Sequence, residues 1–336
     1  MTTNGNAILL LAHGTPDKPE DVPAYMRNVT SGRTIPDAVM EEVKHRYGMI
    51  GRSPLTEITM QQAAELQREI GVPVYVGMRN WHPYVGATVK KMVADGVTHA
   101  VGICLAPQNS RTSVGLYKRA ALAEAGTTLS VDFVESWHDH PLLIKAFAAR
   151  LAPAWKRACE EMGKKVPVIF TAHSVPERTI ADGDPYSSQT QETAALVAKE
   201  IPAMLESDWR FAFQSQGMSG GVWIGPTVES TIDALRDAGH TAVLIQPVGF
   251  VCDHVEVLFD IDILFKQYAA ERGMKLWRTE SLNSSPEFIA ALAEVARARL
   301  SKLSSSTPRP ASASVSLAPS SSPSSEIRSS SSSSVS

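Results

Sequence analysis

The chain has 336 residues, 43% of them apolar, which is enough to bury a sizeable core and to form two domains. Its formal net charge is −3, and it carries neither a basic stripe nor an acidic block, so nothing points to nucleic acid as a partner. The three cysteines are widely spaced and form no Cys-x-x-Cys pair. They cannot supply the four thiolates of an iron–sulfur cluster, and we expect no such cluster.

The sequence also lacks the signals that direct a chain to or across a membrane. The N-terminus, Met1-Thr-Thr-Asn-Gly-Asn, has no basic start followed by an apolar stretch. No stretch reaches the roughly 20 apolar residues of a membrane span. Cysteines without a disulfide framework suit a reducing compartment. We therefore expect a cytoplasmic protein with no integral membrane segment.

Short apolar strands alternate with helical patterns through the first half of the chain. Strands separated by helices indicate a parallel sheet with helices on both faces. The predicted strands are 7–12, 74–77, 100–104 and 129–134, and the predicted helices are 37–47, 57–69, 85–94 and 113–125.

The second half repeats this order after a long predicted helix at 141–162, in which we expect Pro153 to cause a break or kink. The fold class is therefore α/β, with two similar domains at residues 1–150 and 151–303. Serine, proline and alanine dominate residues 304–336, which we expect to form a disordered tail because they offer little apolar surface to bury. The predicted strands of this half are 168–171, 210–214, 242–246 and 275–278, and the helices are 191–204, 228–238, 255–272 and 286–302.

The two halves share a local signature at the end of their first strands. Ala12-His13 follows the apolar run of the first half, and Ala172-His173 follows that of the second half. In each case a small residue and, two positions later, a proline come next. Ligands of open α/β sheets bind at the carboxyl ends of the strands. The repeated signature favours a cleft between the two domains over two unrelated strand–turn junctions.

A histidine and a carboxylate are the best candidates for chemistry in that cleft. His173 ends a strand beside polar neighbours, so its imidazole is free for a ligand or a proton. Glu256 and Asp260 lie four positions apart on the predicted helix 255–272, where Asp253 is a plausible N-cap and apolar residues surround the acids. A neutral imidazole and a carboxylate facing each other can bind a divalent metal or move protons near neutral pH.

Two further stretches have the composition of anion-binding segments. Arg46-Tyr47 precedes a glycine-rich turn that contains Ser53, and an arginine fork binds carboxylates well. The segment from Ser110 to Tyr117 brings hydroxyl groups to a helix start, which suits a negatively charged ligand group. Each stretch has a plainer interpretation, since an arginine near a helix C-terminus and hydroxyls at a helix entry are also common in structural roles.

Taken together, these stretches resemble a ferrochelatase. The resemblance implies two flavodoxin-like chelatase domains around a porphyrin cleft, and a lyase that inserts Fe²⁺ into the macrocycle in haem biosynthesis. The matching motifs occur in order over roughly residues 7 to 300. The specific ones are the histidine motifs Ala12-His-Gly-Thr-Pro16 and Ala172-His-Ser-Val-Pro-Glu177 and the motif Asp253-His-Val-Glu256, and the supporting ones include Ile50-Gly-Arg-Ser-Pro-Leu55 and Gly183-Asp-Pro-Tyr186.

The resemblance also assigns roles to individual residues. It places His173 and Glu256 at the metal site on one face of the porphyrin, with Asp260 behind Glu256 as a proton or metal relay. It places the substrate-binding positions at Thr30, Arg46, Tyr47, Ser53 and Tyr117. Porphyrin and Fe²⁺ would be substrates, so no prosthetic group is expected, and transient proteins that donate iron or accept haem are conceivable partners.

The early segment Tyr25-Met-Arg-Asn-Val-Thr-Ser-Gly-Arg33 is more similar to the soluble, coproporphyrin-using branch than to the protoporphyrin-using branch. Three positions depart from that pattern. His13 stands where the branch usually has a tyrosine that can ligate the product iron from the opposite face, and imidazole can do the same. Thr30 stands where an arginine is common, and Leu264 stands where an acid is common.

Two other functions remain open from the sequence. A cobalt- or sirohydrochlorin-type chelatase would also carry Ala-His strand ends, one in each half. A non-enzymatic haem or metal carrier is the other alternative, because His13 could serve as an axial ligand. The length of the chain and the Asp253-His-Val-Glu256 motif favour ferrochelatase over the other chelatase, and a carrier should tolerate loss of Glu256 while keeping its ligand affinity.

Overall fold

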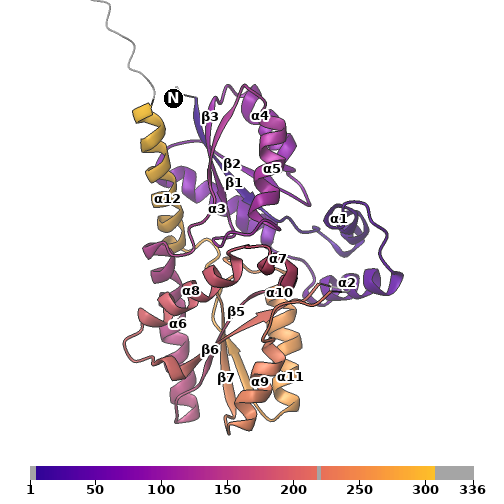
Figure 1. Ribbon diagram of the computed structural model, residues 1–336, viewed down its shortest axis with the longest axis vertical. Coiled ribbons are helices and arrows are strands. Elements are labelled where there is room, and N and C mark those ends of the chain that lie inside the picture. Colours follow the sequence, from indigo (N-terminus) through magenta and orange to yellow (C-terminus); the bar gives the residue numbers. More distant parts are fainter. Residues whose placement is uncertain (1–4, 218–220, 307–336) are drawn as a thin grey trace, which may run out of the picture.

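The computed structural model describes residues 5–217 and 221–306. It shows two α/β units, each built on a parallel sheet, joined end to end (Figure 1). Each unit holds one four-stranded sheet in which all strands are parallel, with helices packed on the faces. The predicted fold class is confirmed.

The N-terminal sheet has the strand order β2-β1-β3-β4. Its strands are runs of apolar residues whose side chains are mostly buried on both sides, as expected for a parallel sheet between helices. The elements of this half are β1 (Asn6–Ala12), η1 (Pro19–Asp21), α1 (Val22–Val29), α2 (Asp37–Ile50), α3 (Leu55–Ile70), β2 (Val74–Met78), α4 (Val85–Ala94), β3 (His99–Cys104), α5 (Val114–Ala125) and β4 (Ser130–Val134).

The C-terminal sheet has the corresponding order β6-β5-β7-β8. The elements of this half are α6 (Pro141–Met162), β5 (Val168–His173), α7 (Glu177–Ala181), α8 (Tyr186–Lys199), η2 (Glu206–Asp208), β6 (Trp209–Gln214), α9 (Val228–Asp237), β7 (Ala242–Pro247), α10 (Val255–Leu258), the π-helical segment η3 (Asp260–Phe265), α11 (Lys266–Glu271), β8 (Lys275–Arg278) and α12 (Pro286–Ser306).

The two strands that carry the Ala-His signature occupy equivalent places in the two sheets. β1 pairs with β2 and β3, and β5 pairs with β6 and β7, so each is an inner strand. His13 directly follows β1, and His173 is the last residue of β5. The repeated signature therefore marks the same position of the fold twice, at the carboxyl ends of the two sheets.

The hydrophobic core is continuous between the halves. One cluster of buried side chains runs from Ile8 and Leu10 of β1 to Phe170 of β5, through residues of α6 and α12. Helix α12 returns from the C-terminal half to pack against α3 and α6, and Arg297 of α12 forms an ion pair with Glu69 of α3 at 2.8 Å. Figure 1 shows α12 alongside the N-terminal unit.

The predicted domain boundaries therefore fall inside helices. Residues 150 and 151 lie in α6, and residues 303 and 304 lie in α12. The boundaries at these positions remain a prediction. Residues 307–336, which form most of the predicted tail, lie outside the described residues.

Helices α1, α8 and α6 differ from the predictions for physical reasons. Helix α1 was not predicted, because its eight residues are too few for a clear period. Helix α8 begins at Tyr186, where Asp184 accepts a hydrogen bond from the Tyr186 N–H (3.0 Å), and ends at Lys199 instead of continuing to Met204, because Pro202 disfavours a helix before it. Helix α6 runs through Pro153, which lies on its exposed face between the buried Leu151 and Trp155.

The predicted helix 255–272 is interrupted by the π segment η3. The last turns of the predicted helix form α11. The prediction therefore gave the correct extent of the helical region but not the π turn within it. π turns insert an extra residue into a helix and are frequent at functional sites. Here the segment begins at Asp260, which is 3% exposed, while Leu264 of the same segment is 40% exposed.

One glycine fixes how closely the chain after β7 approaches the strand that carries His173. A Cβ atom added at Gly249 would lie 2.6 Å from the Cβ and 2.8 Å from the Cα of Ala172. We expect Gly249→Ala to lower the free energy of unfolding by about 1–3 kcal/mol, because the end of β5 has to shift to make room. Urea denaturation measures this loss.

The matched control is Gly48→Ala in α2, where the added Cβ meets no atom within 4 Å. This variant should leave stability unchanged or raise it slightly, because alanine favours a helix. Equal stabilities for the two variants would show that the approach of Gly249 to Ala172 is not as close as the structure has it.

Candidate active site in the cleft

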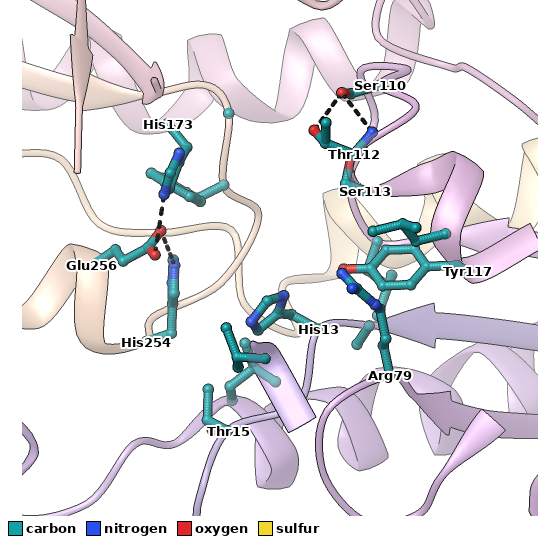
Figure 2. A pocket seen from close by; sticks show the side chains of 18 of the residues that line it. His13, Thr15, Arg79, Ser110, Thr112, Ser113, Tyr117, His173, His254 and Glu256 are labelled. Carbon is teal, nitrogen blue, oxygen red and sulfur yellow. Dashed lines mark hydrogen bonds and ion pairs between the residues drawn. The ribbon is translucent and has the colours of Figure 1, made fainter. Parts of the chain in front are cut away.

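A cavity of about 510 Å³ opens between the two halves, and this volume lies in the range of small-molecule sites. It is lined by residues that follow β1 and β2, by the start of α5, and by residues that follow β5 and β7. Both Ala-His strand ends therefore face the same cavity, and Figure 2 shows the side chains that point into it.

His173 and Glu256 meet at one side of the cavity. The Nε2 atom of His173 lies 3.5 Å from Oε1 of Glu256, and each side chain is 32% exposed. Glu256 lies in the first turn of α10, where Gln214 at the end of β6 donates a hydrogen bond to its backbone carbonyl (2.7 Å). The parallel sheet thus brings the ends of β5 and β6 and the start of α10 to one place.

A second imidazole contacts the same carboxylate. The Nε2 atom of His254 lies 3.6 Å from Oε2 of Glu256 (Figure 2). The Nδ1 atoms of His173 and His254 face the backbone carbonyls of Ser174 and Cys252, which only accept hydrogen bonds. Each Nδ1 therefore carries a proton, and both Nε2 atoms are directed at Glu256.

The charges of His173 and Glu256 stabilise each other. Burial alone would lower the pKa of His173, but the charge of Glu256 and their hydrogen bond raise it to about 9, above the ordinary 6.5. Burial alone would raise the pKa of Glu256, but His173 and His254 hold it well below its usual value. Without a ligand, the resting pair at neutral pH is an imidazolium and a carboxylate.

At rest this arrangement is a proton-loaded pair, and the metal-ligand roles of His173 and Glu256 remain predictions. Among residues 5–217 and 221–306, no group of three or more histidine, cysteine or acidic side chains is arranged to hold a metal ion. The groups nearest to such an arrangement, His173, His254 and Glu256, contact one another directly. A divalent ion that bound Glu256 would compete with the His173 proton for the same carboxylate.

Asp260 lies behind Glu256 and does not line the cavity. Ser215 donates a hydrogen bond to its Oδ2 atom, and Arg46 Nη1 lies 3.6 Å from its Oδ1 atom. Burial raises the pKa of Asp260 to about 6, against the lowering effect of the Ser215 hydrogen bond. Asp260 can therefore take up or release a proton near neutral pH, which suits the predicted relay. That role remains a prediction.

His13 enters the cavity separately, from the end of β1 (Figure 2). Its Nε2 atom lies 3.1 Å from the hydroxyl of Tyr25 and 3.1 Å from the side-chain nitrogen of Asn80. Burial lowers the pKa of His13 to about 4, mainly because the charged form is poorly solvated there. His13 is therefore neutral at pH 7, in contrast to His173.

Of the predicted substrate-binding residues, only Tyr117 lines the cavity. Thr30 hydrogen-bonds to the carbonyls of Met26 and Arg33 at the end of α1. Tyr47 is buried against the edge of Tyr25, and Ser53 accepts a hydrogen bond from Thr15 (3.1 Å). These three lie one layer behind residues that do line the cavity, and their substrate contacts remain predictions.

Arg46 also points elsewhere in this structure. It pairs with Glu42 at 2.8 Å and with Asp260, and its guanidinium lies 5.3 Å from the centre of the Phe259 ring. These contacts tie α2 to the segment that carries Glu256 and Asp260. A contact between Arg46 and substrate also remains a prediction.

Sequence reasoning did not assign a role to His254, Arg79, Tyr25 or Trp223, which also line the cavity. For His254 the signal was present, since it lies inside the Asp253-His-Val-Glu256 motif. Positions two apart on a helix do not share a face. His254, however, is the N-cap of α10 with an extended backbone (φ −162°, ψ −176°), and its ring turns back toward Glu256.

Comparison with known proteins decides the family. A family model described as ferrochelatase matches residues 5–300. The chain belongs to the ferrochelatase family. A ferrochelatase of Acidobacterium capsulatum is 54% identical over 320 residues, covering 91% of this chain and 98% of the relative. A coproporphyrin III ferrochelatase of Bacillus subtilis is 36% identical over 313 residues, covering 90% and 100%.

The predicted family and enzyme class are thereby confirmed: this ferrochelatase is a lyase that inserts a metal into a porphyrin in haem biosynthesis. Among solved structures, the chelatase SirB from Bacillus subtilis with Fe³⁺ aligns with a TM-score of 0.54 at 11% identity, covering 90% of this chain and 98% of that one. This likeness supports the chelatase fold alone.

Within the described part of the chain, none of the helices combines the length and apolar character needed to cross a membrane. The cytoplasmic location and the absence of a prosthetic group remain predictions.

The pair predicts a specific titration. In an NMR titration of the histidine rings, assigned with His173→Gln, the pKa of His173 should be about 9 in the wild type. In Glu256→Gln it should fall by more than one unit, because the neutral amide no longer stabilises the imidazolium while burial still opposes it.

The matched control is Glu192→Gln. Glu192 contacts a different histidine, His138, at 2.9 Å. This variant should leave the titration of His173 unchanged. A His173 pKa that is the same in Glu256→Gln and in the wild type would contradict the proposed coupling.

Proposed function

We propose that this ferrochelatase inserts Fe²⁺ into coproporphyrin III, with protoporphyrin IX as the alternative porphyrin. The supporting observation is the cavity itself, which has the His173–Glu256 pair on one side and arginine and hydroxyl side chains elsewhere on its wall. Coproporphyrin III carries four propionates and protoporphyrin IX carries two, so coproporphyrin III needs more of these polar partners. Relatives at 35–38% identity that carry the name coproporphyrin III ferrochelatase also support this substrate.

The charge state of the pair suggests an order of events. Insertion replaces two pyrrole protons with one Fe²⁺, so two protons have to leave the macrocycle. When Fe²⁺ binds the Glu256 carboxylate, it neutralises the charge that holds the proton on His173. The imidazole, which is partly exposed, then releases that proton to solvent. The neutral Nε2 of His173 then accepts a pyrrole proton as the general base. After Fe²⁺ has passed from Glu256 to the pyrrole nitrogens, the freed Glu256 carboxylate, with Asp260 behind it, accepts the second proton.

The cavity wall contributes by shaping the substrate. A planar porphyrin directs its nitrogen lone pairs into its own plane, so the metal reaches them more easily when the ring is bent. Contacts at the ring edge can support such distortion and lower the barrier by ~1–5 kcal/mol. Trp223, whose ring centre lies 6.2 Å from that of His173, belongs to the wall on the metal side.

His13 would act on the product. A neutral imidazole is a good ligand for haem iron, and the low pKa of His13 keeps it neutral. We assign to it axial ligation of the inserted iron from the side of β1. Because imidazole binds haem iron more tightly than phenol does, release of the product should be slower than with a tyrosine at this position.

Both alternatives predict different behaviour. A sirohydrochlorin-type chelatase would prefer sirohydrochlorin and would accept Co²⁺. A carrier would keep its affinity for porphyrin or haem after loss of Glu256 and would turn nothing over. The decisive measurement is an anaerobic assay of Fe²⁺ and Co²⁺ insertion into coproporphyrin III, protoporphyrin IX and sirohydrochlorin.

We expect the highest kcat/KM with Fe²⁺ and coproporphyrin III. The control is His173→Ala, which should still bind porphyrin, measured by fluorescence quenching, while insertion falls below detection. Preference for sirohydrochlorin would rule out coproporphyrin III as the substrate. Wild-type turnover by His173→Ala would rule out His173 as the general base.

Replacement of His13 gives a separate prediction. In His13→Tyr, the absorption spectrum of the bound product should change from that of an imidazole-ligated haem to that of a phenolate-ligated haem, and product release should be faster. Stopped-flow transfer of product haem to an apo-haem protein measures the release rate. An unchanged spectrum would show that His13 does not ligate the iron.

A further inference from the structure

The segment 253–262 carries Glu256, yet little within the segment fixes its conformation. It consists of the residues before α10, the four-residue helix α10 and the start of the π segment η3. Helices of this length are not stable by themselves and depend on tertiary contacts. The segment also holds four acids and no lysine or arginine, so its carboxylates repel one another. Contacts from outside the segment therefore have to hold it in place.

Arg278, the last residue of β8, contacts both ends of this segment. Its Nε and Nη2 atoms each donate to a carboxylate oxygen of Asp262 at 2.8 Å, which makes a two-pronged ion pair. Its Nη1 atom lies 3.3 Å from Oδ1 of Asp253, and the Arg278 side chain is only 13% exposed. One largely buried guanidinium thus joins position 253, before α10, to position 262, within η3.

Asp253 is itself anchored from several directions. It does not cap α10, as the sequence suggested, because the N-cap is the next residue. Its side chain instead accepts hydrogen bonds from Ser281 (2.7 Å) and Asn283 (2.9 Å), and its N–H donates to the side chain of Asn283 (2.9 Å). Gln62 of α3, in the N-terminal half, donates to the carbonyl of Asn283 at 2.7 Å. Asp253 is therefore a fixed point, to which Arg278 ties η3.

Arg278 also removes a source of repulsion. It pairs with Asp253 and Asp262, the two outer carboxylates of the segment. Glu256, between them in the sequence, faces two imidazoles instead. Without Arg278, the outer carboxylates would lose this ion pair while partly buried, and they would be more stable nearer to water. The segment between them would move with them.

We propose that Arg278 is a positioning residue for metal insertion, because it holds the segment 253–262 so that the Glu256 carboxylate stays in contact with His173. Arg278 does not line the cavity, so it acts through Glu256 and not on the substrate. A displacement of about 1 Å at a reacting group can cost a large factor in rate. This inference deepens the proposed function and rests on it, since it takes Glu256 to act in the reaction.

The test combines an NMR titration of His173 with the Fe²⁺ insertion assay. In Arg278→Gln, the pKa of His173, about 9 in the wild type, should fall by about half a unit or more, because Glu256 moves away from the imidazolium. Loss of the Arg278 charge alone would raise this pKa, so a fall reports a change of position. The kcat should fall on the order of tenfold, while the KM for porphyrin stays within about twofold of the wild type.

Two further variants separate the effect of charge from that of position. Arg278→Lys keeps the charge but cannot form both prongs to Asp262, so it should recover only part of kcat. The double variant Arg278→Gln/Asp262→Asn removes one charge of each sign, and it should still show the fall in the pKa of His173. If Arg278→Gln does not fold, the two measurements on Arg278→Lys decide, and wild-type values for both would overturn the proposal.

The matched control is Arg272→Gln. Arg272 is 23% exposed, and its Nε atom lies 2.6 Å from Oδ1 of Asp233, which belongs to α9 and not to the segment 253–262. Any loss of stability in this variant should leave the titration of His173 and kcat unchanged. A wild-type titration and kcat in Arg278→Gln, or the same losses in Arg272→Gln, would overturn the proposal.

Failure of this proposal is distinguishable from failure of the proposed function. If Glu256→Gln inserts Fe²⁺ at the wild-type rate, the role of Glu256 in the reaction fails, and a lowered pKa of His173 in Arg278→Gln would still show that Arg278 holds the pair together. If Glu256→Gln is impaired and Arg278→Gln is not, the role of Glu256 stands and that of Arg278 fails.

Discussion

The contact between His173 and Glu256 depends on the parallel sheet of the C-terminal half. An imidazole at the end of β5 and a carboxylate at the start of α10 are separated by more than eighty positions, yet their reactive atoms lie 3.5 Å apart. Three features of the sheet make this possible. The inner strand β5 ends at the cleft, Gln214 of the neighbouring β6 holds the backbone of Glu256, and Gly249 lets the chain after β7 pass against Ala172. The contact between His173 and Glu256 is therefore a property of strand order and close backbone approach, and the remainder of the cavity is arranged around it.

The sequence was most informative where one physical rule dominates. The predictions placed the eight strands of the described residues within two residues at each end. The signal was clearest for inner strands such as β1, because a strand buried on both faces has no polar alternation to confuse the pattern. The Ala-His repeat located the site, because strand ends of parallel sheets meet at one edge. Prediction was weaker where tertiary contacts determine the local conformation. The N-cap conformation that turns His254 toward Glu256, and the π segment that buries Asp260, are set by packing and leave no local period in the sequence. Arg79 had no signal of its own, since nothing in the sequence shows that a single arginine after a strand will line the cavity.

The cavity holds histidines in opposite charge states. His173 is a cation at rest because Glu256 stabilises its proton, and His13 is neutral because burial penalises its charged form. A porphyrin bound between them would meet a proton-handling, metal-accepting side and a side that offers an uncharged ligand. This asymmetry would give the reaction a direction, because iron would be attracted to the carboxylate on one face and the finished haem would be held by the neutral nitrogen of His13 on the other.

The position of Arg46 offers a link between substrate binding and the removal of the pyrrole protons. In the structure its guanidinium faces Asp260 and lowers the pKa of that carboxyl, which burial has raised to about 6. The resemblance to ferrochelatases assigns the same guanidinium to the substrate. An arginine that turned to a propionate would leave Asp260 buried with less positive charge nearby, and the pKa of Asp260 would then rise further. Asp260 would become a better proton acceptor at the moment when pyrrole protons have to leave. Binding of the porphyrin edge and removal of its central protons would then be coupled through one arginine, without any larger rearrangement of the sheet.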